Sequence, residues 1–135
     1  MSAYPAVASS IFVLDMRFPS ASLDAALRLL VPASTEVVAQ RECLDCRVLV
    51  DAVQGTQVRY QEEWASQAAL DRRVRSDEFR RLLIAADLSA LEPRVLLGTL
   101  HGTLGLAHLS EVRAGASTVL PPSSPATGGA GAPEV

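Results

Sequence analysis

The spacing of hydrophobic positions changes several times along this chain, and each change marks a boundary between a predicted strand and a predicted helix. Apolar residues that alternate or run together predict strands over residues 10–18, 44–52, 56–64 and 94–101. Apolar residues three or four apart predict helices over residues 20–38, 66–75 and 76–86. The last apolar segment, residues 104–113, is short, and we expect it to be extended.

Local signals support these boundaries. Serines stand where they can cap the three helices, at Ser20 or Ser22, at Ser66 and at Ser76. Pro32 interrupts the first helix, which predicts a kink or two helical pieces near that residue. The turn over residues 51–56, with Gly55 near its end, predicts that the second and third strands form a hairpin.

The predicted order is β-α-β-β-α-β with a short terminal strand, which is the pattern of a ferredoxin-like α+β sandwich. Two helices cover one face of a four-stranded antiparallel sheet in that fold. The other face carries Val and Leu as well, and nothing else in the sequence is left to cover it. An uncovered apolar sheet favours a partner, so we expect a homodimer that forms through the sheet faces.

Composition narrows the class of protein. The chain has 135 residues, of which 49% are hydrophobic, so we expect one domain with a real core over residues 10–113. We expect residues 1–9 to be a flexible N-terminus and residues 114–135, rich in Pro, Gly, Ala and Ser, to be a disordered tail. We also expect a cytoplasmic protein, since we find neither a signal sequence nor an apolar stretch that could span a membrane.

Charge excludes further functions. The net charge is −3 without long blocks of one sign, which argues against nucleic acid as a partner. All twelve basic residues are Arg, so Schiff-base and lysine-nucleophile mechanisms are excluded.

The third predicted strand carries the candidate chemistry. A period of two places Tyr60, Glu62 and Trp64 on one face. A carboxylate beside an indole on a buried face is costly unless both groups are packed and hydrogen-bonded. We therefore expect a pocket here. Three alternatives stay open: Trp64 is a core residue, Glu62 is a structural carboxylate paired with an arginine, and Tyr60 serves packing.

Several motifs resemble the antibiotic biosynthesis monooxygenase family of the dimeric α/β barrel superfamily. The resemblance covers residues 10–113. It rests on Cys43, Tyr60-x-Glu62-x-Trp64-x-Ser66, Leu70, Arg75-Ser76-Asp77-Glu78-Phe79, Asp87-Leu88-Ser89 before Pro93, and the segment from Gly105 to Arg113. It implies a ferredoxin-like fold, a dimer, and oxygenation of a small aromatic or quinol-type compound without flavin, metal or another cofactor.

The resemblance also implies roles for residues. Trp64 would pack against the substrate ring, and Glu62 would act as a base or an orienting acceptor, with a pKa raised by burial. Arg73 and Phe79 would complete the pocket, and Arg73 stands where many catalytic members of the family carry His. Arginine stays protonated and cannot act as a general base, but it can bind a carboxylate or stabilise an enolate. Two versions stay open: an enzyme for an anionic substrate, or a binding protein without catalysis. Haem handling is a third and weaker interpretation.

Two further pairs of residues are weighed against simpler interpretations. Cys43 and Cys46 form a Cys-x-x-Cys motif, but a period of two would send them to opposite faces of the strand, which argues against redox or metal chemistry. His101 and His108 are seven residues apart, and neither has a ligand set for metal. His101 is a candidate for the substrate pocket if the last strand reaches it. A surface or hydrogen-bonded core histidine is the simpler interpretation.

Overall fold

The computed structural model of the protein describes residues 8–115. Within these residues, Ser9–Leu100 form one compact unit, and residues 101–115 belong to another. The first unit contains the sheet and three α-helices, and the second contains α4 (Leu106–Arg113). Most of the predicted flexible N-terminus and disordered tail lies outside the described residues, although Ser9 already belongs to the first strand.

The sheet has the predicted topology. Its strands are β1 (Ser9–Arg17), β2 (Cys43–Val50), β3 (Gln57–Trp64) and β4 (Arg94–Leu100), in the spatial order β2-β3-β1-β4. All neighbouring strands are antiparallel. The β2–β3 hairpin is confirmed, and the carboxylate of Asp51 accepts hydrogen bonds from the backbone N–H groups of Val53 and Gln54 within its turn.

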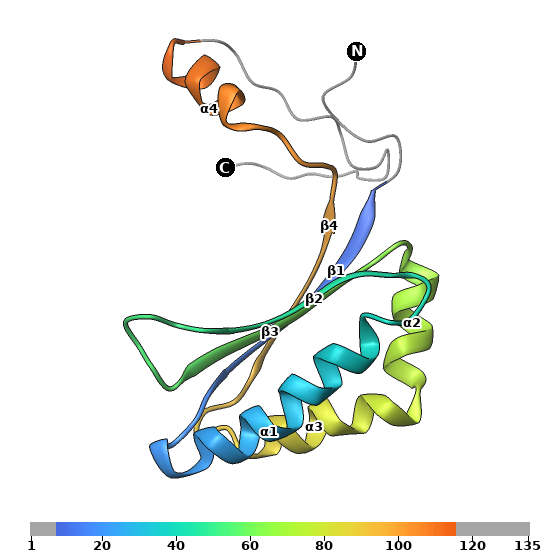
Figure 1. The fold of residues 1–135 in the computed structure, drawn as a ribbon, viewed down its shortest axis with the longest axis vertical. Coiled ribbons are helices and arrows are strands. Elements are labelled where there is room, and N and C mark those ends of the chain that lie inside the picture. Colours follow the sequence, from blue (N-terminus) through green and yellow to red (C-terminus); the bar gives the residue numbers. More distant parts are fainter. Residues whose placement is uncertain (1–7, 116–135) are drawn as a thin grey trace. The chain divides into compact units, whose positions relative to one another are not determined.

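Helices cover one face of this sheet. They are α1 (Ser20–Val37), α2 (Gln67–Arg75), the 3₁₀ turn η1 (Asp77–Phe79) and α3 (Arg80–Asp87). Figure 1 shows α1, α2 and α3 on the same side of the strands, and an ion pair between Arg81 and Glu36 at 2.7 Å links α3 to α1. The ferredoxin-like α+β fold predicted from the sequence is therefore confirmed.

The core lies between the helices and this face of the sheet. Even-numbered residues of β1 and β3 point into it, because the register pairs Phe12 with Glu62 and Leu14 with Tyr60. Leu30, Leu70 and Leu82 on the helices are buried against the sheet. The sheet face opposite the helices is called the open face below, and it carries the odd-numbered residues of β1 and β3 together with the even-numbered residues of β4.

The helix starts agree only in part with the prediction. The side chain of Ser66 caps α2 by accepting a hydrogen bond from the N–H of Ala69 at 3.1 Å, as predicted. The predicted cap of α1 by Ser20 or Ser22 is wrong, because α1 begins after Pro19 and has no side-chain cap. Ser76 precedes η1, but its hydroxyl donates to the carbonyl of Arg73 at 2.7 Å instead of capping.

Pro32 does not divide the first helix. Helix α1 runs without interruption from Ser20 to Val37, so the alternative of two helical pieces is wrong. Pro32 and Arg28 both lie on the exposed side of α1. The carbonyl of Arg28, which loses its usual N–H partner to the proline ring, can therefore be hydrated.

The segment after β4 is also corrected. Residues 104–113 were expected to be extended, but Leu106–Arg113 is the helix α4, with Gly105 at its N-cap. Its large apolar residues Leu106, Leu109 and Val112 are three apart, which is the spacing of a helical face. No helix within residues 8–115 is long and apolar enough to cross a membrane.

Candidate functional site: a closed polar cluster beside an open apolar cleft

The carboxylate of Glu62 is the centre of a buried polar cluster. Its Oε2 accepts a hydrogen bond from the hydroxyl of Tyr60 at 2.5 Å, and its Oε1 accepts one from Nε1 of Trp64 at 2.8 Å. Both partners are on β3, two residues to either side, so the strand's period of two builds this part of the cluster by itself. The predicted shared and buried face is confirmed.

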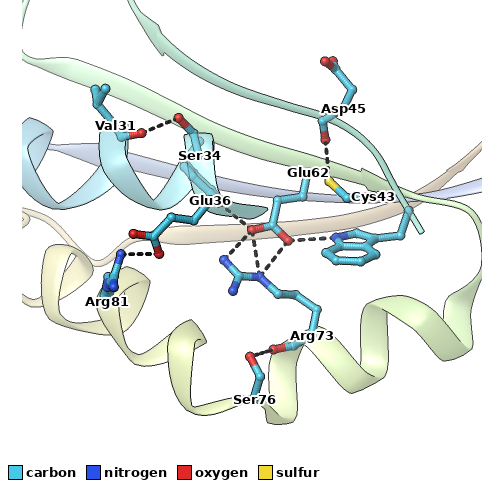
Figure 2. A network of polar contacts seen from close by, with 11 residues as sticks. Val31, Ser34, Glu36, Cys43, Asp45, Glu62, Arg73, Ser76 and Arg81 are labelled. Atoms are coloured by element: carbon cyan, nitrogen blue, oxygen red, sulfur yellow. Dashed lines mark hydrogen bonds and ion pairs between the residues drawn. The ribbon is translucent and has the colours of Figure 1, made fainter. Parts of the chain in front are cut away.

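Arg73 joins the cluster from α2. Its Nε lies 3.1 Å and 3.2 Å from the two oxygens of Glu62, and its Nη2 lies 2.9 Å from Oε2. The side chains of Arg73 and Glu62 are 2% and 0% exposed. Figure 2 shows the Glu62 carboxylate facing the Arg73 guanidinium, which reaches it from the helix. Because this pair ties α2 to β3, it helps fix the position of the helix on the sheet.

The cluster is electrostatically balanced. Burial lowers the pKa of Arg73, but the hydrogen bonds from its guanidinium to Glu62 and the negative charge of that carboxylate outweigh burial, so the pKa is raised. Burial, and next the charge of Glu62, raise the pKa of Tyr60, which keeps its hydroxyl protonated as a donor. A buried ion pair that is also hydrogen-bonded in this way leaves no net charge to attract a ligand.

This geometry limits what the cluster can do chemically. A general base must reach a substrate proton with a free lone pair, and both oxygens of Glu62 already accept from Tyr60, Trp64 and Arg73. The guanidinium of Arg73 is likewise engaged by Glu62. The arrangement therefore matches the alternative of a structural carboxylate paired with an arginine.

A small polar depression adjoins one end of the cluster. Trp64 and Arg73 contribute to its wall, together with Glu42 and Arg72, which form an ion pair, and it encloses about 180 Å³. Charged side chains dominate its rim, so it is poorly suited to an apolar ring.

A second cavity, called the apolar cleft below, opens between the β1–β4 side of the sheet and the helices α2 and α3. Its volume is about 260 Å³. Every residue that lines it is apolar: Phe12, Leu14, Val74, Phe79, Leu83, Val95 and Leu97. A concave and largely apolar surface is the usual form of a small-molecule site.

Phe79 connects the cleft to the polar cluster. Its ring lines the cleft, and the guanidinium carbon of Arg73 lies 5.4 Å from the ring centroid. The rings of Phe79 and Phe12 are 5.6 Å apart and tilted by 54°, an arrangement that favours aromatic contacts. The buried ion pair therefore helps to hold one wall of the cleft in place.

The structure thus divides the predicted pocket. Phe79 lines the apolar cleft, Trp64 and Arg73 line the polar depression, and Tyr60 and Glu62 are fully buried within the cluster. His101 begins the other unit of the chain, so its role in a substrate pocket stays a prediction.

Most residues of the cleft were not predicted as site residues. Leu14, Val74, Leu83, Val95 and Leu97 come from four different elements. The sequence held one signal, which is that Val95 and Leu97 are two residues apart on a predicted strand and so share one face. Only the structure shows that this strand is an edge strand and that both side chains are exposed.

The two cysteines lie on the same side of β2. Cys43 is opposite Trp64 and Cys46 is opposite Glu62, so the expectation that they lie on opposite faces is wrong. A bulge between Cys43 and Asp45 inserts one residue and changes the alternation. Burial raises the pKa of the thiol of Cys43 to about 11 and that of Cys46 to about 12, so neither is a ready thiolate. Within residues 8–115 no cluster of three ligand side chains could hold a metal ion.

Solved structures share this fold. A conserved protein from Methanosarcina mazei is 18% identical with a TM-score of 0.63, over 67% of this chain and 90% of that one. An antibiotic biosynthesis monooxygenase is 20% identical with a TM-score of 0.60, over 66% and 95%. A candidate antibiotic biosynthesis monooxygenase from Deinococcus radiodurans is 13% identical with a TM-score of 0.65, over 72% and 97%. At these identities the likeness concerns the fold.

The family is identified from the sequence. No curated protein matches the chain. The profile of the family described as antibiotic biosynthesis monooxygenase matches residues 11–83, which is more than half of the chain and includes the whole polar cluster. The chain therefore belongs to the antibiotic biosynthesis monooxygenase family.

Proposed function

We propose that this protein is a cofactor-independent monooxygenase that acts on a small aromatic compound of the quinol type. The observation that carries the proposal is the apolar cleft, which offers two aromatic rings and five aliphatic side chains to a planar substrate. Membership in the family supports the reaction class. The cleft supports the substrate class, because its lining matches a ring more closely than a sugar or a nucleotide.

The proposed reaction is balanced by the substrate and dioxygen alone. A hydroquinone and one O₂ give a hydroxyquinone and one water, so one oxygen atom enters the ring and all four electrons that reduce O₂ come from the substrate. Loss of a proton from a hydroxyl that stays hydrated at the mouth of the cleft produces the electron-rich anion that donates the first electron. No side chain that lines the cleft titrates, so this proton passes to water at the mouth of the cleft. The protein holds the ring and limits water around it.

The residues predicted as catalytic receive supporting roles in this proposal. Glu62, Tyr60 and Trp64 orient Arg73, and Arg73 supports the ring of Phe79. These are positioning residues, because their hydrogen bonds join members of the cluster to one another and none points into the cleft.

Oxygen consumption with a hydroquinone tests the proposal. The wild-type protein should consume one O₂ per substrate, and ¹⁸O₂ should label the hydroxyquinone. Leu97→Asp places a carboxylate in the cleft at a residue that is 67% exposed, so the fold should persist while oxygen uptake is lost. Val53→Asp, at a residue that is 90% exposed on the β2–β3 turn, is the matched control and should retain uptake. Equal uptake by the wild type and Leu97→Asp would refute the cleft as the reaction site.

A second candidate function is a binding protein without catalysis. The observation that favours it is the closure of Glu62 by three hydrogen-bonding partners, which leaves the cluster without a free base. Ligand-dependent protection against thermal unfolding, together with no oxygen uptake across a panel of quinols, would select this function. The interpretation as a haem-handling protein is disfavoured at Arg73, because its protonated guanidinium has no lone pair to offer iron.

We further propose a homodimer that forms through the open face. Leu96 and Leu100 are partly exposed on this face of β4, and Val13 and Ile11 lie beside them on β1. At Gly98 a Cβ atom would meet Ile11 only at an ordinary 3.5 Å, so the isolated chain does not require glycine there. A close approach by a second sheet would account for it.

A further inference from the structure

We propose that the ligand of the apolar cleft carries no fixed charge: it is a neutral ring compound without carboxylate, sulfonate or phosphate groups. This inference rests on the proposed function only for the place of the ligand, and it names the class of substrate that the cleft accepts. It also counts against one version left open by Arg73, an enzyme for an anionic substrate.

The lining of the cleft supplies no partner for a charge. Its seven side chains contain no hydrogen-bond donor or acceptor. Four of them are between 44% and 67% exposed: Val74, Leu83, Val95 and Leu97. Covering these side chains with a ring releases water from apolar surface on both molecules, which favours binding. Taking a carboxylate into the same place costs its hydration, and nothing in the lining replaces that hydration.

The positive charge of Arg73 does not make the cleft a site for an anion. Arg73 is not among the residues that line the cleft, and its guanidinium carbon lies 5.4 Å from the ring centroid of Phe79, which is one of them. Its charge is compensated by Glu62, at 2.9 Å from Nη2 to Oε2. To bind an anionic ligand, Arg73 would have to leave Glu62, and the buried carboxylate would then lose its counter-ion. Arg73, whose position in the family suggested an anion site, is therefore already engaged in an internal ion pair with Glu62.

The aromatic rings in the lining of the cleft favour a planar ring system. Phe12 and Phe79 present their rings at 54° to each other, so a planar ligand can meet the face of one and the edge of the other. The exposed side chains mark the open side: Val95 and Leu97 on the edge strand β4, and Val74 and Leu83 on the helices. A hydroxyl on the ligand can stay hydrated there while the rings are buried.

Binding of two matched probes tests the inference. We choose 2,6-dihydroxynaphthalene, which is neutral at pH 7, and naphthalene-2,6-dicarboxylate, which has the same rings and a charge at each end. The second probe has no neutral end to place against the apolar lining. Calorimetry should show the neutral probe binding at least roughly tenfold more tightly to the wild type. Methyl NMR shifts should map it to Leu14, Leu83 and Leu97.

A gain-of-function variant sharpens the test. Leu97→Arg adds an unpaired guanidinium to the lining at an exposed residue, so it should weaken the neutral probe and bring the dicarboxylate to equal or tighter binding. Val53→Arg, on the exposed turn, is the matched control and should leave both affinities as in the wild type.

The opposite results would overturn the inference. They are equal binding of both probes by the wild type, methyl shifts confined to other residues, and no binding of either probe. If neither probe binds and Leu97→Arg halves the molecular mass in solution, a second copy of the chain covers the cleft and the inference is wrong. Preferential binding of the neutral probe without oxygen uptake would refute the proposed monooxygenase activity alone and leave the inference standing.

Discussion

Arg73 and Glu62 form a buried ion pair in which two guanidinium nitrogens meet one carboxylate, with Nη2 at 2.9 Å and Nε at 3.1 Å from Oε2. The pair joins α2 to β3, and Tyr60 and Trp64 complete the hydrogen bonding of the carboxylate. Such a pair adds little stability over well-packed apolar residues, but removing one partner leaves an uncompensated charge in the core. The effect of the pair on the free energy of unfolding is therefore seen when only one of its two residues is replaced.

Arg73→Ala should lower the free energy of unfolding by about 3–5 kcal/mol, because Glu62 then stays buried without its counter-ion. Arg73→Lys should cost less, since it keeps the charge but loses the two-point contact. Urea denaturation followed by the fluorescence of Trp64 measures both changes.

The matched control is Arg28→Ala, which breaks an ion pair with Asp24 on the exposed surface of α1. That change should cost below about 1 kcal/mol. A loss of similar size in Arg73→Ala and Arg28→Ala would contradict the buried pair. The double variant Glu62→Leu with Arg73→Met removes both charges and should recover part of the loss seen in Arg73→Ala.

The neutral donors of the cluster give a second prediction. Trp64→Phe and Tyr60→Phe each remove one hydrogen bond to Glu62 and keep an aromatic ring in the core. Each should destabilise the protein by about 1–3 kcal/mol, because an acceptor on a buried carboxylate is left with fewer partners. Thermal unfolding measured by circular dichroism in the far ultraviolet serves for both variants, since it does not depend on the tryptophan. No loss in either variant would show that water replaces the missing donor.

The buried face of β3 was predictable because it depends on local periodicity. Alternation alone places Tyr60, Glu62 and Trp64 together, and a charged residue on such a face requires a partner. The candidate Arg73 came from the resemblance to the family. Nothing in the sequence required it to pair with Glu62, because that contact depends on how α2 lies across the sheet.

Features that depend on irregular or long-range geometry were missed. The bulge after Cys43 reverses the alternation of β2, and no residue in its sequence announces it. The apolar cleft gathers single residues from several elements, so no short pattern contains it. Helix α4 was mistaken for a strand because it has only eight residues, and a short apolar segment does not distinguish the two periods well.

The cysteines provide a third prediction. Burial raises the pKa of Cys43 to about 11 and that of Cys46 to about 12, against 9.0 for an ordinary thiol. Both thiols should therefore react slowly with a disulfide reagent at pH 8 in the folded protein, and both should react at once in urea. Two equivalents released in urea would calibrate the assay. Rapid reaction of the folded protein would show that β2 opens locally or that the thiols are exposed.

Asp15 gives a fourth prediction, on acid stability. Its hydrogen bonds from Arg59 lower its pKa below 3.8, against the opposing effect of burial, and the charges of Arg59 and Arg94 add to the lowering. A depressed folded-state pKa stabilises the protein fully above the unfolded value, and this stabilisation is lost as the pH falls through the folded value. The free energy of unfolding should therefore fall less steeply between about pH 4 and 2 in Asp15→Asn than in the wild type. Identical slopes would mean that the ion pair with Arg59 is absent in solution.

The proposed dimer gives the last prediction. Leu96 is 38% exposed and lies on the open face opposite Val13. Leu96→Glu should convert the dimer to a monomer without unfolding it, because it places a carboxylate in the apolar part of the open face, beside Val13 and Ile11, where a second sheet would remove its hydration. Analytical ultracentrifugation measures the mass, and circular dichroism checks the fold. Val53→Glu, on the exposed turn, should remain dimeric. A wild-type protein that sediments as a monomer, or a Leu96→Glu variant that stays dimeric, would place any association on another surface. In the second case the helix-side apolar cleft, with its exposed Leu97, would be the next surface to test by the same substitution.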